Sequence, residues 1–394
     1  MKIVFFNRFF FPDTSATSQI LSDLAFHLAQ RGLEVHVVTT GGDGRVGEET
    51  IRGVRVHRVA TGNTATHGLV PRAAAYARYY VGARRAALRL IAPGDVVVLK
   101  TDPPLLPAAM TALAKRRGAQ VFIWLQDLFP EVAKAYGVRG LAGPVYALLR
   151  RMRDRALRKA DGVVAISESI AQRLRTVVPA QRLHVIHNWA HGEELRPRAD
   201  AGRDLRIQWD LRDAFVVAYS GNFGRVHEFD TILDAARVLQ DQEDVVFTLI
   251  GRGPRLAAVK ERAARLALRN VRFEDHQPRE RLAETLGVAD VHLTVLDPRF
   301  EGLVHPSKLY GVMAAGRPTL FVGDVTGETA RILRESDSGS AVATGEASGL
   351  AAQILRLRDA PAEVKRLGDN ARRAFEERYD LPLAMARWEA LLAR

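Results

Sequence analysis

The sequence predicts an α/β protein of two doubly wound domains, each with a parallel sheet that helices cover on both faces. The first observation behind this prediction is length, because 394 residues exceed what one hydrophobic core usually holds. The second is that short apolar segments alternate with segments of helical periodicity through most of the chain. The third is an interruption after Asn188, in the polar stretch HGEELRPRADAGRDLR, which indicates a linker.

In the first half, predicted strands and helices alternate as far as residue 190. The expected strands are residues 2–6, 34–39, 54–59, 95–99, 120–125, 162–166 and 183–186. Amphipathic segments that are expected to form helices include 18–31, 104–117 and 167–177. Residues 1–190 are therefore predicted to form the first domain.

The second half repeats this alternation after a linker predicted at 191–213, where Pro197 and Gly202 interrupt the periodicity. The expected strands are residues 215–219, 245–250, 271–274, 291–295, 319–322 and 341–343. The second domain is therefore predicted at 214–378. The last segment, 379–394, has a helical pattern and no strand after it, so it can pack back across the first domain.

Composition places the chain among soluble globular enzymes, since 47% of its residues are hydrophobic and 26% are charged. It has no cysteine, which excludes disulfides and thiolate metal sites. The apolar start, residues 1–6, is too short for a signal peptide, and no window approaches 18 uncharged apolar residues. These features predict a cytoplasmic protein.

Positive charge is concentrated in the first half. All of the net charge of +12 lies in residues 1–195, which hold 27 Lys and Arg against 15 Asp and Glu, while the remainder holds 30 of each. Residues 71–90 contain no acid and five arginines, which are Arg72, Arg78, Arg84, Arg85 and Arg89. Tyr76, Tyr79 and Tyr80 interleave with them, and residues 150–161 form a second basic run. We expect this domain to meet an anionic membrane surface or polyanion, with two solvated helix faces as the alternative.

Three successive strand ends of the second domain each offer glycine and a basic residue, in SGNFGRVHEFD, GRGP and FEGLVHPSKLYG. The candidate residues in these turns are Gly221, Asn222, Arg225, Gly251, Gly253, Glu301, Gly302, Ser307 and Lys308. Ligands of doubly wound domains bind beyond the carboxyl ends of strands, and glycine allows a phosphate to approach the backbone. Together the turns predict a diphosphate site, although each alone is consistent with an ordinary strand–helix connection.

Lys308 is the most specific of these candidates for an anion-binding site. Leu309, Val312 and Met313 share one helical face and Gly316 ends the segment, so Lys308 stands at the start of a helix. A helix start already attracts anions through its free N–H groups and its dipole. A lysine added to such a place indicates a strongly negative ligand.

The first domain offers two candidate contacts with a substrate. Ser15, Ala16 and Thr17 open a helix after the first strand, where small residues let a ligand approach; capping by Thr14 or Ser15 is the alternative. Gln126 and Asp127 follow a strand end, and Asp127 could equally be a helix cap.

Motifs of several enzyme classes are absent from the sequence. The sequence has no H-E-x-x-H, no G-x-x-x-x-G-K-[ST] and no G-x-S-x-G. It also has no Asp-x-Asp pair to hold a metal on a nucleotide diphosphate. We therefore expect neither a metal site nor a cofactor, and we expect protein cations and helix starts to handle a diphosphate.

The chain resembles the retaining glycosyltransferases of family 4, which have the two-domain GT-B fold. The resemblance covers essentially the whole chain and is carried by FFPDTSATSQILSDLAFHLAQRGLEVHVVT, WLQDLFPE, AISES, VIHNWA, YSGNFGRVHEFDTILDAA, GRGP and PSKLYGVMAAGRP. It is similar above all to bacterial surface-polysaccharide enzymes, including those that add N-acetylfucosamine or related sugars to lipid-linked intermediates. The resemblance implies two Rossmann-like domains that face each other across a cleft, with the donor in the second and the acceptor in the first.

The implied reaction is transfer of a sugar, with retention and without a metal, from a UDP- or GDP-sugar to a polyprenyl-diphosphate-linked glycan. It implies peripheral attachment to the inner face of the cell membrane. The implied catalytic residues are Lys308, Arg225, Glu301 and Asp127. The implied donor-binding residues are Gly221, Asn222, Gly251, Gly253, Gly302, Leu303, Val304, Ser307 and Gly311. The implied acceptor-side residues are Ser15, Ala16, Thr17 and Gln126.

The sequence departs from the family at several of these positions. Asn222 and His227 fall near the family's arginine and lysine in the phosphate turn, with Arg225 as the cationic substitute. Glu301 has a longer spacing to the following helix than the family's first glutamate, and Gly311 replaces the glutamate that reaches the ribose. Gln126 stands where the family has a histidine.

Two other functions remain as alternatives. A UDP-sugar 2-epimerase on the same fold would keep the nucleotide site but would leave the basic first domain without a purpose. A basic binding protein, for nucleic acid, is the second alternative, but the sequence has no recognised nucleic-acid module.

Overall fold

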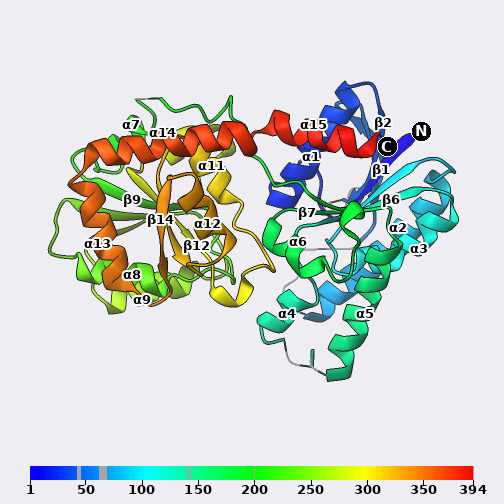
Figure 1. The fold of residues 1–394 in the computed structure, drawn as a ribbon, viewed down its shortest axis with the longest axis horizontal. Coiled ribbons are helices and arrows are strands. Elements are labelled where there is room, and N and C mark those ends of the chain that lie inside the picture. Colours follow the sequence, from blue (N-terminus) through cyan, green and yellow to red (C-terminus); the bar gives the residue numbers. More distant parts are fainter. Residues whose placement is uncertain (42–45, 62–68, 139, 142, 199, 394) are drawn as a thin grey trace. The chain divides into compact units, whose positions relative to one another are not determined.

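The computed structural model describes the whole chain except residues 42–45, 62–68, 139, 142, 199 and 394. It divides into two compact units (Figure 1). Unit 1 comprises Met1–His187, Gly302–Val304 and Met385–Arg394, and unit 2 comprises Asn188–Glu301 and His305–Ala384. The division after His187 falls three residues before the predicted end of the first domain.

Unit 1 contains an eight-stranded sheet in the order β3-β4-β2-β1-β5-β6-β7-β8. Its strands are β1 (Lys2–Phe6), β2 (Glu34–Thr40), β3 (Gly47–Ile51), β4 (Val54–Val59), β5 (Val96–Lys100), β6 (Gln120–Leu125), β7 (Gly162–Ala165) and β8 (Leu183–Val185). All neighbours pair in parallel except β3 and β4. The buried, nearly continuous apolar strands that the sequence predicts are those of a parallel sheet covered on both faces.

The helices of unit 1 are α1 (Ala16–Gln30), α2 (Leu69–Leu90), α3 (Leu106–Arg116), α4 (Glu131–Ala135), α5 (Gly143–Lys159) and α6 (Glu168–Leu174). On one sheet face, α2 and α3 bury Tyr79, Leu106 and Met110 against alternate strand residues such as Val97 and Val121. Strand side chains alternate between the two faces of a sheet. Trp124 is three positions after Val121 in β6, so it points to the opposite face.

Unit 2 contains a six-stranded parallel sheet in the order β11-β10-β9-β12-β13-β14. Its strands are β9 (Phe215–Ser220), β10 (Val245–Ile250), β11 (Val271–Glu274), β12 (Val291–Val295), β13 (Thr319–Gly323) and β14 (Gly339–Ala343). Its helices are α7 (Arg203–Gln208), α8 (Asp230–Val238), α9 (Leu256–Arg265), α10 (Leu282–Gly287), α11 (Lys308–Ala314), α12 (Glu328–Glu335), α13 (Ala347–Arg358) and α14 (Pro361–Arg378). One core cluster packs α8, α9 and α13 on one face, and a second packs α7 on the other.

Most of the C-terminal helix α15 (Leu381–Leu392) groups with the first unit, which is one of the placements that the sequence allows. The ring of Trp388 lies 4.6 Å from that of Trp124, centroid to centroid. The side chain of His27 in α1 is hydrogen-bonded to Glu389 at 2.8 Å. Residues 385–392 of α15 therefore add to the helical layer on the face of the unit 1 sheet to which Trp124 points.

Two elements differ from the sequence prediction. Strand β3, GEETI, was not expected because its polar side chains are mostly exposed and show no apolar alternation. The segment predicted as a linker, 191–213, contains α7, and Leu205, Trp209 and Leu211 are buried in unit 2. These three residues are separated by charged ones, so the apolar face of this short helix is hidden in the sequence pattern.

Candidate active site

The three strand ends predicted to bind a diphosphate meet at one edge of the unit 2 sheet. β9 lies between β10 and β12, and all three run in parallel, so the turns after them are neighbours. Gly221 follows β9 and Gly251 follows β10, and the segment containing Lys308 comes after β12. The sheet order therefore gathers residues that are 87 positions apart in the chain, counting from Gly221 to Lys308.

The glycines of these turns allow two backbones to approach each other closely. Gly221, Gly251 and Gly253 have φ angles of +141°, +140° and +151°, which side-chain-bearing residues rarely adopt. A Cβ atom on Gly251 would lie 2.0 Å from the carbonyl oxygen of Gly221. A Cβ atom on Gly253 would lie 2.6 Å from the backbone nitrogen of Phe223. The turns are thus packed backbone against backbone at the predicted donor site.

Lys308, the first residue of α11, extends its ammonium group against these turns. Its Nζ atom donates a hydrogen bond to the hydroxyl of Tyr219 and lies 3.9 Å from the centroid of that ring. A Cβ atom on Gly221 would lie 2.9 Å from the same Nζ atom, so glycine is needed there to leave room for the lysine. Among the residues that the structure describes, no carboxylate pairs with Lys308.

Burial makes the charge of Lys308 costly. Loss of hydration lowers the pKa of its ammonium group to about 7. His227 is hydrogen-bonded through Nδ1 to the Tyr219 hydroxyl at 2.9 Å, and burial and the Lys308 charge lower its pKa to about 3. His227 is therefore neutral at physiological pH and supplies no counter-charge. A cation held here without an anion has the electrostatics of a site for a negatively charged ligand.

The other two predicted catalytic residues of unit 2 have different surroundings. The side chain of Arg225 is exposed and makes no hydrogen bond or ion pair in the described part of the chain. Glu301 accepts a hydrogen bond at 3.0 Å from the backbone N–H of Glu328, the first residue of α12. A Cβ atom on Gly327 would lie 2.7 Å from the Glu301 carboxyl carbon, so glycine makes room for this contact.

The other predicted donor-binding residues divide between the two units. Gly302, Leu303 and Val304 group with unit 1, where the Leu128 N–H donates to the Leu303 carbonyl at 2.8 Å. Ser307 precedes α11 without a capping bond from its side chain, Gly311 lies on α11 itself, and Asn222 is exposed. A Cβ atom on Gly311 would come no closer than 3.7 Å to a neighbour, the Leu286 side chain.

In unit 1, the predicted acceptor-side residues also lie at strand ends that are neighbours in the sheet. β5 lies between β1 and β6, so the start of α1 after β1 comes near the residues that follow β5 and β6. The hydroxyl oxygens of Ser15 and Thr17 are buried without a hydrogen-bond partner in the described chain. Ser15 occupies the N-cap position of α1 but its side chain makes no capping bond, so capping does not explain it. Ala16 is the first residue of this helix.

Lys100, which the sequence analysis did not single out, is the most buried charged group of this region. It ends β5 with no exposed surface, and its Nζ atom donates to the Thr17 carbonyl at 3.0 Å. The same atom lies 3.9 Å from the Trp124 ring centroid. Burial lowers the pKa of Lys100 to about 7, against the opposing effect of Asp102 and Asp127. The signal in the sequence was a lysine that closes an apolar strand directly before Thr101 and Asp102.

Asp127 has the electrostatics of a group that can exchange a proton near neutral pH. Partial loss of hydration and the nearby Asp102 carboxylate raise the pKa of Asp127 to about 6, but the residue is exposed, and contact with solvent weakens both effects. It does not cap α4, because the N-cap of that helix is Pro130. Its neighbour Gln126 donates its backbone N–H to the Thr101 hydroxyl at 3.2 Å. A carboxylate with a raised pKa is suited to general base catalysis.

The tyrosines of α2 do not lie at its outer surface, which corrects the prediction that they suit a membrane interface. Tyr79 is fully buried and donates its hydroxyl hydrogen to the Val38 carbonyl. The hydroxyl of Tyr80 donates to the Pro104 carbonyl, and Tyr76 packs under the Arg8 guanidinium at 4.9 Å. The apolar face of α2 is thus used to cover the sheet.

No group of three or more His, Asp or Glu residues that could hold a metal ion occurs in the chain as far as the structure describes it. Within the same residues, no helix is both long enough and apolar enough to span a bilayer.

Comparison with known proteins identifies the family of each half of the chain. Residues 16–189 match the family model described as glycosyl transferase 4-like domain, and residues 204–374 match glycosyl transferases group 1. The chain is 29% identical over 300 residues to the probable glycosyltransferase WbjE of Pseudomonas aeruginosa, covering 75% of this chain and 74% of that protein.

A second relative is the putative colanic acid biosynthesis glycosyl transferase WcaI of Escherichia coli K12. It is 29% identical over 256 residues, which cover 64% of this chain and 62% of that protein. Among solved structures, HepE from Anabaena in complex with UDP-glucose superposes with a TM-score of 0.75 at 16% identity. That match covers 100% of this chain and 99% of the other, which shows a shared GT-B fold. Because the two family models together match most of the sequence, one in each half, the chain is a glycosyltransferase built of a glycosyl transferase 4-like domain followed by a group 1 domain.

Proposed function

We propose that the protein transfers a sugar, with retention of anomeric configuration, from a nucleotide-diphosphate-sugar to a lipid-linked glycan in surface-polysaccharide synthesis. The observation that carries the donor part is the Lys308 ammonium, held without an acidic partner in the described chain against the Tyr219 side chain and the backbone of Gly221. Support for a nucleotide-sugar comes from HepE, which binds UDP-glucose on the same fold. Support for the pathway comes from WcaI, a relative named for colanic acid biosynthesis.

The role that we propose for Lys308 follows from its positive charge. When the sugar–oxygen bond of such a donor breaks, negative charge grows on the departing diphosphate. A cation already in place stabilises that charge more than it stabilises the intact donor, which lowers the barrier. Because burial disfavours the ammonium in the free protein, binding of the diphosphate should raise the Lys308 pKa and draw in a proton.

On the acceptor side, we propose that Asp127 takes the proton of the attacking hydroxyl or orients it. Its raised pKa places the carboxylate close to the working range of a general base. We propose that the Ser15 and Thr17 hydroxyls, which are buried and have no partner in the described chain, hydrogen-bond to a polar group of the acceptor after a local shift of the start of α1. Lys100 holds the Thr17 carbonyl and is a positioning residue in this scheme.

The reaction is tested by incubating the purified protein with a panel of UDP- and GDP-sugars, with and without a polyprenyl-diphosphate-linked acceptor. Glycosylated acceptor with the donor's anomeric configuration, read by NMR coupling constants, is expected. Formation of an epimeric nucleotide-sugar from donor alone would instead establish the 2-epimerase alternative. Inversion at the anomeric carbon would exclude the retaining mechanism.

Transfer is expected to proceed without a metal, because Lys308 is proposed to supply the charge that a divalent ion would otherwise supply. The measurement is the initial rate in excess EDTA compared with the rate in untreated buffer. The two rates should agree. A loss of activity in EDTA that Mg²⁺ or Mn²⁺ restores would contradict the proposal.

Peripheral attachment of unit 1 to the inner face of the membrane is also part of the proposal. On α2, Val81, Arg84, Arg85 and Leu88 are exposed and follow helical spacing, so they form one basic and apolar face. Neither arginine of this face has an ion-pair partner in the described chain. Each basic residue near an anionic surface contributes about 1 kcal/mol, and the exposed apolar side chains can enter the interface.

Reversing the charge of this face should release the protein from anionic vesicles. For the double variant Arg84→Glu/Arg85→Glu we expect at least about a tenfold weaker association, from the loss of two attractive contacts. Co-sedimentation with vesicles of anionic and of neutral lipid, at low and high salt, measures this association. Arg237→Glu is the control, because Arg237 is an exposed arginine of unit 2 without an ion pair in the described residues. If the unmodified protein and both variants were recovered equally in the supernatant, this face of α2 would not bind the membrane.

A further inference from the structure

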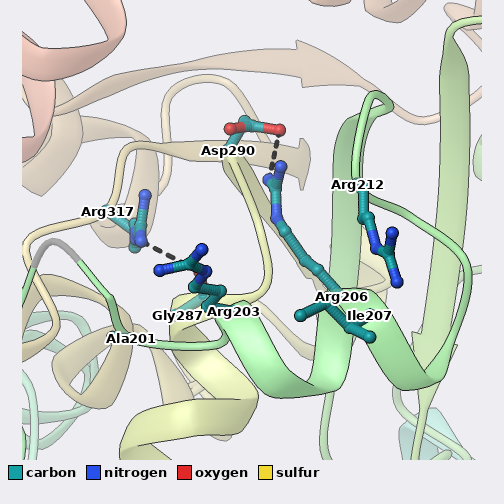
Figure 2. Close-up of a pocket in the computed structure, with 8 residues that line it drawn as sticks. All are labelled: Ala201, Arg203, Arg206, Ile207, Arg212, Gly287, Asp290 and Arg317. Atoms are coloured by element: carbon teal, nitrogen blue, oxygen red, sulfur yellow. Dashed lines mark hydrogen bonds and ion pairs between the residues drawn. The ribbon is translucent and has the colours of Figure 1, made fainter.

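A second recess in unit 2 lies at the other edge of its sheet, away from Gly221 and Gly251. It is lined by Ala201, Arg203, Arg206, Ile207, Arg212, Gly287, Asp290 and Arg317 (Figure 2). Asp290 immediately precedes β12, and Arg317 stands two residues before β13. Because these strands are parallel to β9 and β10, residues that precede them lie at the amino edge of the sheet. We call this group of eight residues the arginine recess.

Close backbone packing builds one corner of the arginine recess. Gly202 has a φ of +81°, and a Cβ atom on it would lie 2.3 Å from the Val288 nitrogen. A Cβ atom on Gly287 would lie 2.6 Å from the Ala201 carbonyl oxygen. The start of α7 is therefore held against the end of α10, which places Arg203 next to Gly287. The Gly287 carbonyl in turn accepts a hydrogen bond from Arg317 at 2.9 Å, so both arginines reach the same corner.

The charges of the arginine recess do not balance. Its one carboxylate, Asp290, accepts hydrogen bonds from the Arg206 guanidinium at 2.6 Å and from the Val216 backbone N–H at 2.7 Å. Arg206 also donates to the carbonyl groups of Val288 and Ala214, so this pair is occupied in holding α7 to the sheet. The side chains of Arg203 and Arg212 make no hydrogen bond or ion pair in the described chain.

Arg317 shows the cost of this imbalance. Its pKa is lowered by burial and by the neighbouring Arg206 charge, which Asp290 only partly opposes. Three guanidinium groups thus border one recess without an anion of their own. Figure 2 shows the guanidinium groups of Arg203 and Arg317 on the same side of the recess, with Arg206 turned to Asp290.

We propose that the arginine recess binds a small phosphorylated molecule, at a site separate from the strand-end glycines and independent of the transfer reaction. A planar guanidinium group can donate two parallel hydrogen bonds to the oxygens of a phosphate. Arginines without a carboxylate partner have these donors free. The cavity, of about 630 Å³, exceeds the needs of a single phosphate and leaves room for a small organic group beside Ile207. The lining has no aromatic side chain on which a base could stack.

The test is isothermal titration of the full-length protein with inorganic pyrophosphate. Arg203→Ala should weaken binding about tenfold or more, because it removes charge-assisted hydrogen bonds and disturbs no contact of the fold. Arg317→Lys keeps a positive charge but loses the guanidinium fork, and it should also weaken binding. Arg237→Ala, an exposed arginine elsewhere in unit 2, should leave the affinity unchanged.

Lys308→Ala separates this site from the donor site. Pyrophosphate binding that persists in Lys308→Ala and is weakened in Arg203→Ala assigns the anion to the arginine recess. Binding that disappears in Lys308→Ala and is unaffected in Arg203→Ala and Arg317→Lys would overturn the proposal. An absence of pyrophosphate binding to the unmodified protein would overturn it as well.

Discussion

Replacing Lys308 with alanine is expected to lower kcat by about 100-fold or more, with unit 2 still folded. Of the three side chains in this described cluster, the Lys308 ammonium alone is charged, because Tyr219 and His227 are both neutral at physiological pH. Losing it leaves the growing charge of the diphosphate facing backbone groups alone. Steady-state kinetics measure the effect once the donor is known, and circular dichroism confirms the fold.

Lys260→Ala is the matched control, because Lys260 is an exposed lysine of the same unit, on α9. It should retain normal turnover. A folded Lys308→Ala variant that also retains normal turnover would remove Lys308 from the mechanism.

The pH profile distinguishes electrostatic catalysis by Lys308 from a structural role. The free protein holds the Lys308 pKa at about 7, below the ordinary value for lysine. The protonated form is the active one in this scheme, so kcat/KM for the donor should fall as pH rises through about 7. The alanine variant should lack that limb of the profile. A merely structural lysine would lower activity equally at every pH.

Replacing Gly251 with alanine is expected to destabilise unit 2 by about 2–5 kcal/mol and to abolish donor binding. The new Cβ atom would lie 2.0 Å from the Gly221 carbonyl oxygen, and the φ of +140° disfavours any side chain. Because the three nearest atoms all belong to the Gly221 backbone, relief of the clash requires that the turns after β9 and β10 separate. Those turns form the proposed diphosphate site. Urea denaturation and calorimetry with the donor measure the two effects.

Gly349→Ala provides the comparison for a glycine without such contacts. Gly349 lies on α13, and a Cβ atom there would come no closer than 3.8 Å to any neighbour. Alanine favours a helix over glycine, so this variant should be unchanged or up to about 1 kcal/mol more stable. If Gly251→Ala proved as stable as Gly349→Ala, that result would contradict the close packing of the two turns.

The positions of the candidate residues in unit 2 could largely be predicted because they depend on local patterns. Gly221 and Gly251 directly follow apolar strands, and Lys308 directly precedes an apolar helical face, so their places were visible in the sequence. Arg225 was predicted from the same turn, but its side chain points to solvent, and only the fold shows this. A turn sequence sets the backbone, whereas the direction of a long side chain depends on what packs around it.

Residues whose importance comes from distant neighbours could not be predicted. Lys100 became notable only when its ammonium was found buried between the Thr17 carbonyl and the Trp124 ring, on other elements. Likewise, the helix of residues 203–208 and its contact with Asp290 depend on strands 215–220 and 291–295 lying side by side. No spacing within the sequence encodes such contacts.

By itself, the sequence determined the alternation of strands and helices, the two-domain division, the strand-end glycines and the place of Lys308, because hydrophobic period and glycine conformation are local properties. Tertiary structure alone decided the order of strands in each sheet, and hence which strand ends meet. It also decided the pKa values near 7 of Lys100 and Lys308 and the unbalanced charge of the arginine recess. These properties arise from burial and from charges far apart in the chain, which packing brings together.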